Sequence, residues 1–206
     1  MPRVTFVRRA QKPNPVVTAK DIKKAKSGKD PEAASYYHWA FMQGGRGGPK
    51  CYSKVHPKPS QLTRSEYLGT MYSHFEDLES MDKSDPEDFK EQLNDKASEI
   101  LEFGQEQTEK KENMSPNLQD SPTGELLEER AEACETMATE LEAAANEVEA
   151  QSDDVPEWDE LTDGEDDKHK IHEGAAFTEK EWATRRTEIM TEIGEEALAS
   201  VSQEIG

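Results

Sequence analysis

The sequence predicts a mainly α-helical protein with a small N-terminal β-hairpin, an antiparallel helical hairpin or bundle with coiled-coil character, and a disordered acidic linker. Apolar residues recur at helical spacing through residues 61–151, which indicates amphipathic helices. An aromatic run followed by glycines lies within residues 36–55, an order typical of two strands joined by a turn. With 33% apolar and 34% charged residues, the chain is too polar for one large core.

Charge divides the chain into two parts. Residues 1–60 contain 13 Lys and Arg against three acids, a net charge of +10. Residues 61–206 contain 12 Lys and Arg against 42 acids, a net charge of −30. A basic segment joined to an acidic one predicts contact with nucleic acid or another polyanion at the basic end.

The basic N-terminal segment, residues 1–60, is expected to fold around one β-hairpin at about 36–55. Residues 20–29 carry five lysines and almost nothing apolar, so we expect a solvated, mobile stretch there. In the first strand, period-two alternation places Tyr37, Trp39 and Phe41 on one face. A lone hairpin is marginally stable, so one face must be covered, and these aromatic residues then belong to a core.

The same hairpin has a functional interpretation, because aromatic rings interleaved with cations are typical of nucleic-acid binding. In that case a ring stacks on a base and the cations contact phosphates. The candidate nucleic-acid-binding residues are Arg46, Lys50, Lys54, Lys58, Tyr37 and Trp39.

No cofactor or metal is expected. The loop at 44–48 lacks the Gly-Lys-Ser/Thr ending of a phosphate-binding loop. His38, Cys51 and His56 have no zinc-ligand spacing. Two cysteines without a motif suggest a reduced intracellular protein, and the lack of an 18-residue apolar run predicts no membrane span. A cytoplasmic location is the expectation.

Three helices are predicted in the helical body, residues 61–151, at about 63–82, 85–113 and 123–151. Thr63 and Glu66 have capping-box spacing at the first helix start. Asp85 as N-cap before Pro86 marks the second.

The third helix has the most regular periodicity, a 3.5-residue repeat typical of coiled coils. It predicts an antiparallel pairing with the second helix, since their connection is short. Self-association into a homodimer is the alternative. The residues of this partner-helix face are Leu127, Ala131, Cys134, Ala138, Leu141, Ala145 and Val148.

The acidic linker, residues 152–176, is expected to be disordered because it is short of apolar residues. Its Trp158 and Leu161, set among carboxylates, suggest a docking motif or a strand that folds back on the basic segment. A C-terminal amphipathic helix is predicted at 177–206. Thr178 and Glu181 have capping-box spacing at its start, and Phe177 with Trp182 has that of a hydrophobic staple.

Several of these segments resemble the opening of certain uncharacterised bacteriophage proteins. They are Tyr-Tyr-His-Trp-Ala-Phe at 36–41, the glycines at 44–45 and Pro-Lys-Pro-Ser-Gln-Leu-Thr at 57–63. The helix that contains Leu-Leu-Glu-Glu-Arg-Ala at 126–131 is similar to the same group, and the resemblance covers about a third of the chain. It implies a phage or prophage origin, hence the host cytoplasm, and it supplies no catalytic residues, because the group has no assigned activity.

The motifs favour a non-enzymatic protein, since no nucleophile elbow, phosphate loop or metal-ligand spacing is present. The first hypothesis is a phage-encoded accessory protein whose basic hairpin binds nucleic acid. Its acidic body would limit non-specific binding or recruit a partner. The alternative is a structural or interaction protein, such as an assembly factor, a host-protein inhibitor or a mimic of DNA, that acts through the coiled-coil face.

Overall fold

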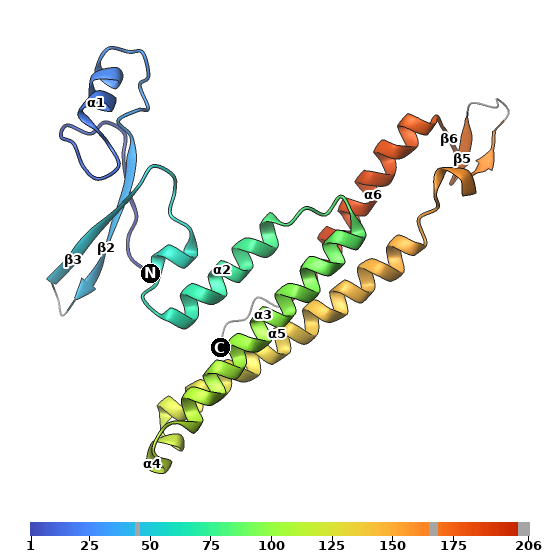
Figure 1. The fold of residues 1–206 in the computed structure, drawn as a ribbon. Coiled ribbons are helices and arrows are strands. Elements are labelled where there is room, and N and C mark those ends of the chain that lie inside the picture. Colours follow the sequence, from blue (N-terminus) through green and yellow to red (C-terminus); the bar gives the residue numbers. More distant parts are fainter. Residues whose placement is uncertain (44–45, 165–168, 202–206) are drawn as a thin grey trace. The chain divides into compact units, whose positions relative to one another are not determined.

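The computed structural model is mainly helical, as predicted (Figure 1). It describes residues 1–43, 46–164 and 169–201, and for 42–43 and 46–47 the backbone alone. The described residues form six α-helices and two three-stranded antiparallel sheets. They divide into two compact units, Met1–Ser73 (unit 1) and His74–Gly206 (unit 2), so the boundary falls inside helix α2, Glu66–Ser80. Each unit is described by itself.

Unit 1 is built on a sheet of strands β1 (Thr5–Val7), β2 (Tyr36–Gln43) and β3 (Arg46–Ser53), in that spatial order. Both pairings are antiparallel, and an irregularity in register separates Ala40 from Met42. Alternation along β2 divides its aromatic side chains between the two faces. Tyr36 and His38 lie together, with ring centroids 5.9 Å apart, whereas Tyr37 meets Phe6 of β1 at 4.8 Å.

The stretch at 20–29, predicted to be mobile, contains helix α1, Ala19–Lys26, so this prediction is wrong for most of it. A capping box explains the helix start: the Thr18 hydroxyl accepts from Asp21 N, and the Asp21 carboxylate accepts from Thr18 N. The Thr18 hydroxyl also donates to the Asp21 carboxylate at 2.7 Å, and this hydrogen bond, together with the one from Thr18 N, lowers the pKa of Asp21. The apolar side of α1 is small but sufficient, because Ile22 packs in a cluster with Val17, Ala10 and Ala34.

Helix α2 begins later than predicted. The sequence favours a start at Thr63, but residues Pro59–Leu62 form a 3₁₀ turn and Thr63 ends it in an extended conformation. The hydroxyl of Ser65 then accepts a hydrogen bond from Leu68 N, as an N-cap does. The turn places Leu62, which is buried, next to the start of the helix.

Unit 2 contains four helices: α3 (Pro86–Glu112), the single turn α4 (Pro116–Gln119), α5 (Pro122–Asp153) and α6 (Glu179–Ala199). Helices α3 and α5 lie side by side along their length and run in opposite directions (Figure 1). Ion pairs mark both ends of the contact: Lys90 pairs with Glu149, and Lys111 with Glu128 at 2.7 Å. The side chain of Asp85 caps α3 through Glu87 N and Asp88 N, as predicted.

Small residues allow α3 and α5 to approach closely. A Cβ atom at Gly104 would lie 2.8 Å from the Cβ of Cys134, a separation that real Cβ atoms do not show. Gly194 of α6 is equally close to the segment that precedes α3, since its Cβ would lie 2.9 Å from that of Lys83. The helices therefore pack through glycine contacts at two separate places.

The segment 152–176, predicted to be disordered, is ordered over the residues that the structure describes. It contains the 3₁₀ turn Trp158–Glu160 and the strands β4 (Thr162–Asp163) and β5 (Lys170–His172), and β6 (Ala175–Phe177) completes a small sheet. Packing on α6 accompanies this order, since the ring centroids of His172 and Phe177 lie 4.7 and 5.5 Å from that of the buried Trp182. An ion pair of 2.7 Å between Arg186 and Glu157 also joins this segment to α6.

Helix α6 begins as predicted, with Thr178 as N-cap and Glu181 completing the capping box. The ring contact of Phe177 and Trp182 confirms the predicted staple. The helix ends at Ala199, so the last residues of the predicted span, 202–206, lie outside the described part of the chain.

The glycine contact between α3 and α5 leads to a stability prediction. We expect Gly104→Ala to lower the free energy of unfolding by about 1–3 kcal/mol, because the added methyl group overpacks the interface with Cys134. Urea unfolding followed by circular dichroism measures this loss. The matched control is Gly69→Ala in α2, where the nearest atom, Thr63 Cγ2, is 3.7 Å from the added Cβ, so helix propensity favours alanine by about 1 kcal/mol. Equal effects of the two substitutions would contradict the proposed close packing.

Candidate nucleic-acid interface

A cavity of about 680 Å³ lies in unit 1, beside the sheet and the beginning of α2. Strand pairing builds one wall: Thr5 is paired with His38 and Ala40 with Lys50, so these four side chains share one face of the sheet. The 3₁₀ turn and α2 supply a second wall that includes Leu62, Thr63, Arg64, Leu68 and Tyr72.

The charged residues that line the cavity are all cations. They are Arg3, Lys50 and Arg64, and all three are exposed to solvent. None of the described lining residues is acidic. An aromatic ring helps to place one of them, because the Arg64 guanidinium lies 5.0 Å from the centroid of Phe41. A lining whose charged side chains are all cations attracts an anion to the cavity.

Four aromatic residues also line the cavity: His38, Trp39, Phe41 and Tyr72. Trp39 is 6% exposed, so most of its ring is packed inside the unit. Its indole Nε1 is buried as well, and no described atom accepts a hydrogen bond from it. Buried N–H groups are nearly always paired in folded proteins, and the Trp39 donor is therefore an exception inside unit 1.

The structure divides the predicted nucleic-acid-binding residues among several places. Lys50 and Trp39 line the cavity together, and the small exposed fraction of Trp39 agrees with the core interpretation of this residue. Tyr37 is half-buried between the rings of Phe6 and His56, at 4.8 and 5.2 Å.

The remaining three lysine and arginine candidates are not among the described lining residues. Lys54 directly follows β3, and its ammonium donates a hydrogen bond to the carbonyl of Ala33 in the segment after α1. Lys58 precedes the 3₁₀ turn, and its backbone N–H donates to Gln61 at 3.1 Å. Arg46 begins β3, and its side chain lies outside the described part of the chain.

Sequence reasoning missed Arg3 and Arg64 as site residues. Arg3 precedes β1, and its place follows from the pairing of Thr5 with His38. Arg64 stands between the 3₁₀ turn and α2, and only the fold brings it onto Phe41. For Arg64 the sequence offers only a weak signal, a single cation beside a predicted helix start.

The predicted partner-helix face is packed inside unit 2. Its last five residues are buried and the first two are half-buried. Met137 and Ala144 of α5 are buried too, because α5 packs against α6 as well as α3. The buried stripe is therefore wider than the predicted seam, and it faces helices of the same chain.

A group of titratable side chains joins the end of α2 to α3. Lys96 pairs with Asp77 at 3.2 Å and with Glu99 at 2.6 Å, while His74 Nδ1 stands 3.8 Å from Glu99. Burial lowers the pKa of His74 below its ordinary value of 6.5, and the Lys96 ammonium adds to the effect against the opposing carboxylates of Glu99 and Asp77. His74 is therefore neutral at neutral pH, and its proximity to Glu99 is not an ion pair there.

The neutral His74 predicts an acid-dependent loss of stability. Above about pH 6.5 its contribution is complete, and it is lost as the pH falls through the lowered pKa, because the unfolded chain then binds the proton more tightly. We expect His74→Gln to weaken the loss of thermal stability between about pH 7.5 and 5.5. His56→Gln, at an exposed histidine of unit 1, is the control for loss of an imidazole. An unchanged pH dependence in H74Q would assign the acid sensitivity to other groups.

In the described part of the chain, no three His, Cys, Asp or Glu side chains gather as metal ligands would. None of the described helices combines the length and apolar character needed to cross a bilayer. Comparison with family models, with curated proteins and with solved structures finds no match to this chain.

Proposed function

We propose that the protein is a non-enzymatic nucleic-acid-binding protein and that unit 1 makes the contact. The observation that carries the proposal is the cavity whose charged lining residues are Arg3, Lys50 and Arg64 and whose lining also includes aromatic residues. Phosphates need cations for affinity, and bases need aromatic or apolar surfaces for stacking, so this lining matches both parts of a nucleotide.

The charge of unit 1 supports the same function. Residues 1–73 carry 14 Lys and Arg against four acids, a net charge of +10. The lysines of α1 add to the attraction, since Lys23 and Lys24 are exposed there. A potential of this kind raises the rate of encounter with a polyanion before any specific contact forms.

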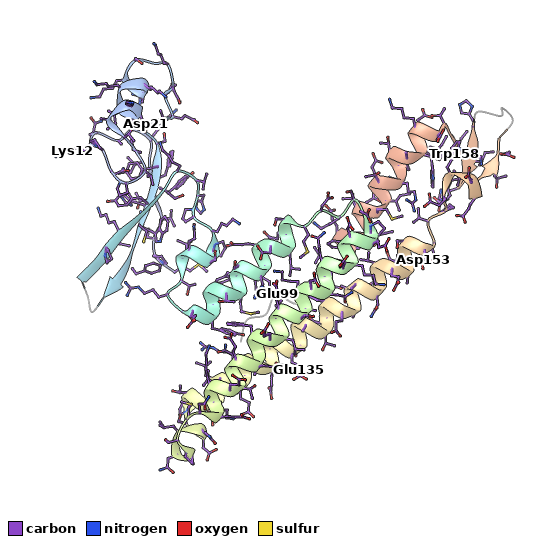
Figure 2. All side chains as sticks on the ribbon, viewed as in Figure 1. Lys12, Asp21, Glu99, Glu135, Asp153 and Trp158 are labelled. Atoms are coloured by element: carbon purple, nitrogen blue, oxygen red, sulfur yellow. The ribbon has the colours of Figure 1, made fainter. Side chains whose placement is uncertain are left out.

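Unit 2 has a complementary role in this proposal. Residues 74–206 carry 41 acids against 11 Lys and Arg, a net charge of −30, and helices α3 and α5 hold many of these carboxylates on exposed positions (Figure 2, with Glu99 and Glu135 labelled). A nucleic acid is repelled by this surface. The acidic unit therefore limits non-specific binding to the cationic surface of unit 1.

A second candidate function is structural, with α3 and α5 as an antiparallel coiled coil that displays a surface to a protein partner. The 3.5-residue repeat and the close approach at Gly104 favour it. Because the seam is buried in the chain, such a partner would meet the outer acidic surface. This candidate differs from the first in requiring no affinity for nucleic acid.

Salt-dependent binding by the full chain tests the proposal. We expect labelled oligonucleotides to bind with an affinity that falls as salt rises, by a log–log slope of about 0.7–0.9 for each phosphate contact. The double variant Lys50→Gln/Arg64→Gln should reduce this slope by about one to two and weaken binding. Fluorescence anisotropy at several salt concentrations measures both.

The control is Lys23→Gln, which removes one exposed cation of α1 away from the cavity. It should have a smaller effect than either Lys50→Gln or Arg64→Gln alone. No salt-dependent binding by the wild-type chain would overturn the proposed function. An effect of Lys23→Gln as large as that of each cavity variant would place the contact elsewhere on unit 1.

A further inference from the structure

We infer that the cavity of unit 1 accepts an unpaired nucleotide, so that the protein prefers single-stranded nucleic acid to a duplex. The inference rests on the proposed function and adds the form of nucleic acid that the site recognises. It depends on the shape of the cavity and on the division of its lining between exposed cations and aromatic rings.

Shape is the first argument. A concave site of about 680 Å³ is within the range of roughly 300–1,000 Å³ that small-molecule sites occupy. In a duplex the bases are stacked and paired, and a protein surface meets phosphates and groove edges. Only a strand with unpaired bases can place one inside such a cavity.

The distribution of chemistry within the lining is the second argument. Arg3, Lys50 and Arg64 are exposed, whereas Trp39 is buried. A nucleotide has the same division, with charge on its phosphate and a flat uncharged base. The base can then contact the ring wall of Phe41 and Tyr72 while the phosphate stays with the exposed cations.

Anisotropy titrations of the full chain test the inference. The probes are fluorescent single strands of DNA and of RNA of about eight nucleotides, and the duplex of the same sequence. We expect both single strands to bind at least tenfold more tightly than the duplex at equal salt. Tyr72→Leu removes a half-buried ring from the lining, so single-strand affinity should fall about tenfold while duplex affinity stays within twofold.

Two further variants separate recognition from folding. Tyr72→Phe keeps the ring and should retain the single-strand affinity. Should Tyr72→Leu fold poorly, Phe41→Leu, which removes another ring of the lining, should give a similar loss of single-strand affinity. The matched control is Trp158→Phe in unit 2, which should leave the affinity unchanged.

The outcomes distinguish this inference from the proposed function. Duplex binding as tight as single-strand binding, with the same salt dependence, overturns the inference and leaves the proposed function standing. Binding of neither probe overturns both. An oligoglutamate of equal charge that competes as well as the single strand would show that the cavity recognises anions alone, and this too overturns the inference.

Discussion

The scarcity of apolar residues is the constraint on which this structure depends. Apolar residues make up 33% of the chain. The burial of apolar surface is therefore concentrated in the few places where backbone segments lie close together. In unit 2 this occurs along α5, where the small residues Ala138, Ala144 and Ala145 are almost fully buried. Close helix approach at Gly104 and Gly194 then replaces bulky side chains as the means of excluding water.

Electrostatics limits how the helices of unit 2 can pack. With 11 Lys and Arg for 41 acids in residues 74–206, most carboxylates must face solvent. The few cations are placed at contacts between elements: Lys90 and Lys111 join α3 to α5, and Lys96 joins α3 to α2. Exposed ion pairs contribute little stability each, and their effect is better understood as favouring one alignment of the helices.

Unit 1 uses its charges in a different way. Lys54 ties two segments through a backbone carbonyl, while Arg3, Lys50 and Arg64 line a cavity without an acidic partner among the described lining residues. Grouped cations repel each other, and folding keeps three of them beside one cavity. That arrangement makes the cavity the candidate site for an anionic ligand.

The sequence by itself determined the mainly helical class, the starts of α3 and α6 and the charge split, because capping residues and periodicity act over one or two turns. It did not identify α1 or the sheet of β4, β5 and β6, since each is stabilised by a few side chains that meet only after folding. The candidate site was predictable in part: Lys50 and Trp39 were named from the aromatic strand. Arg3, Arg64 and Tyr72 join them through strand pairing and through the turn before α2. Tertiary structure alone decided that convergence, because cavity walls are made by segments distant in sequence and no local pattern encodes their distance.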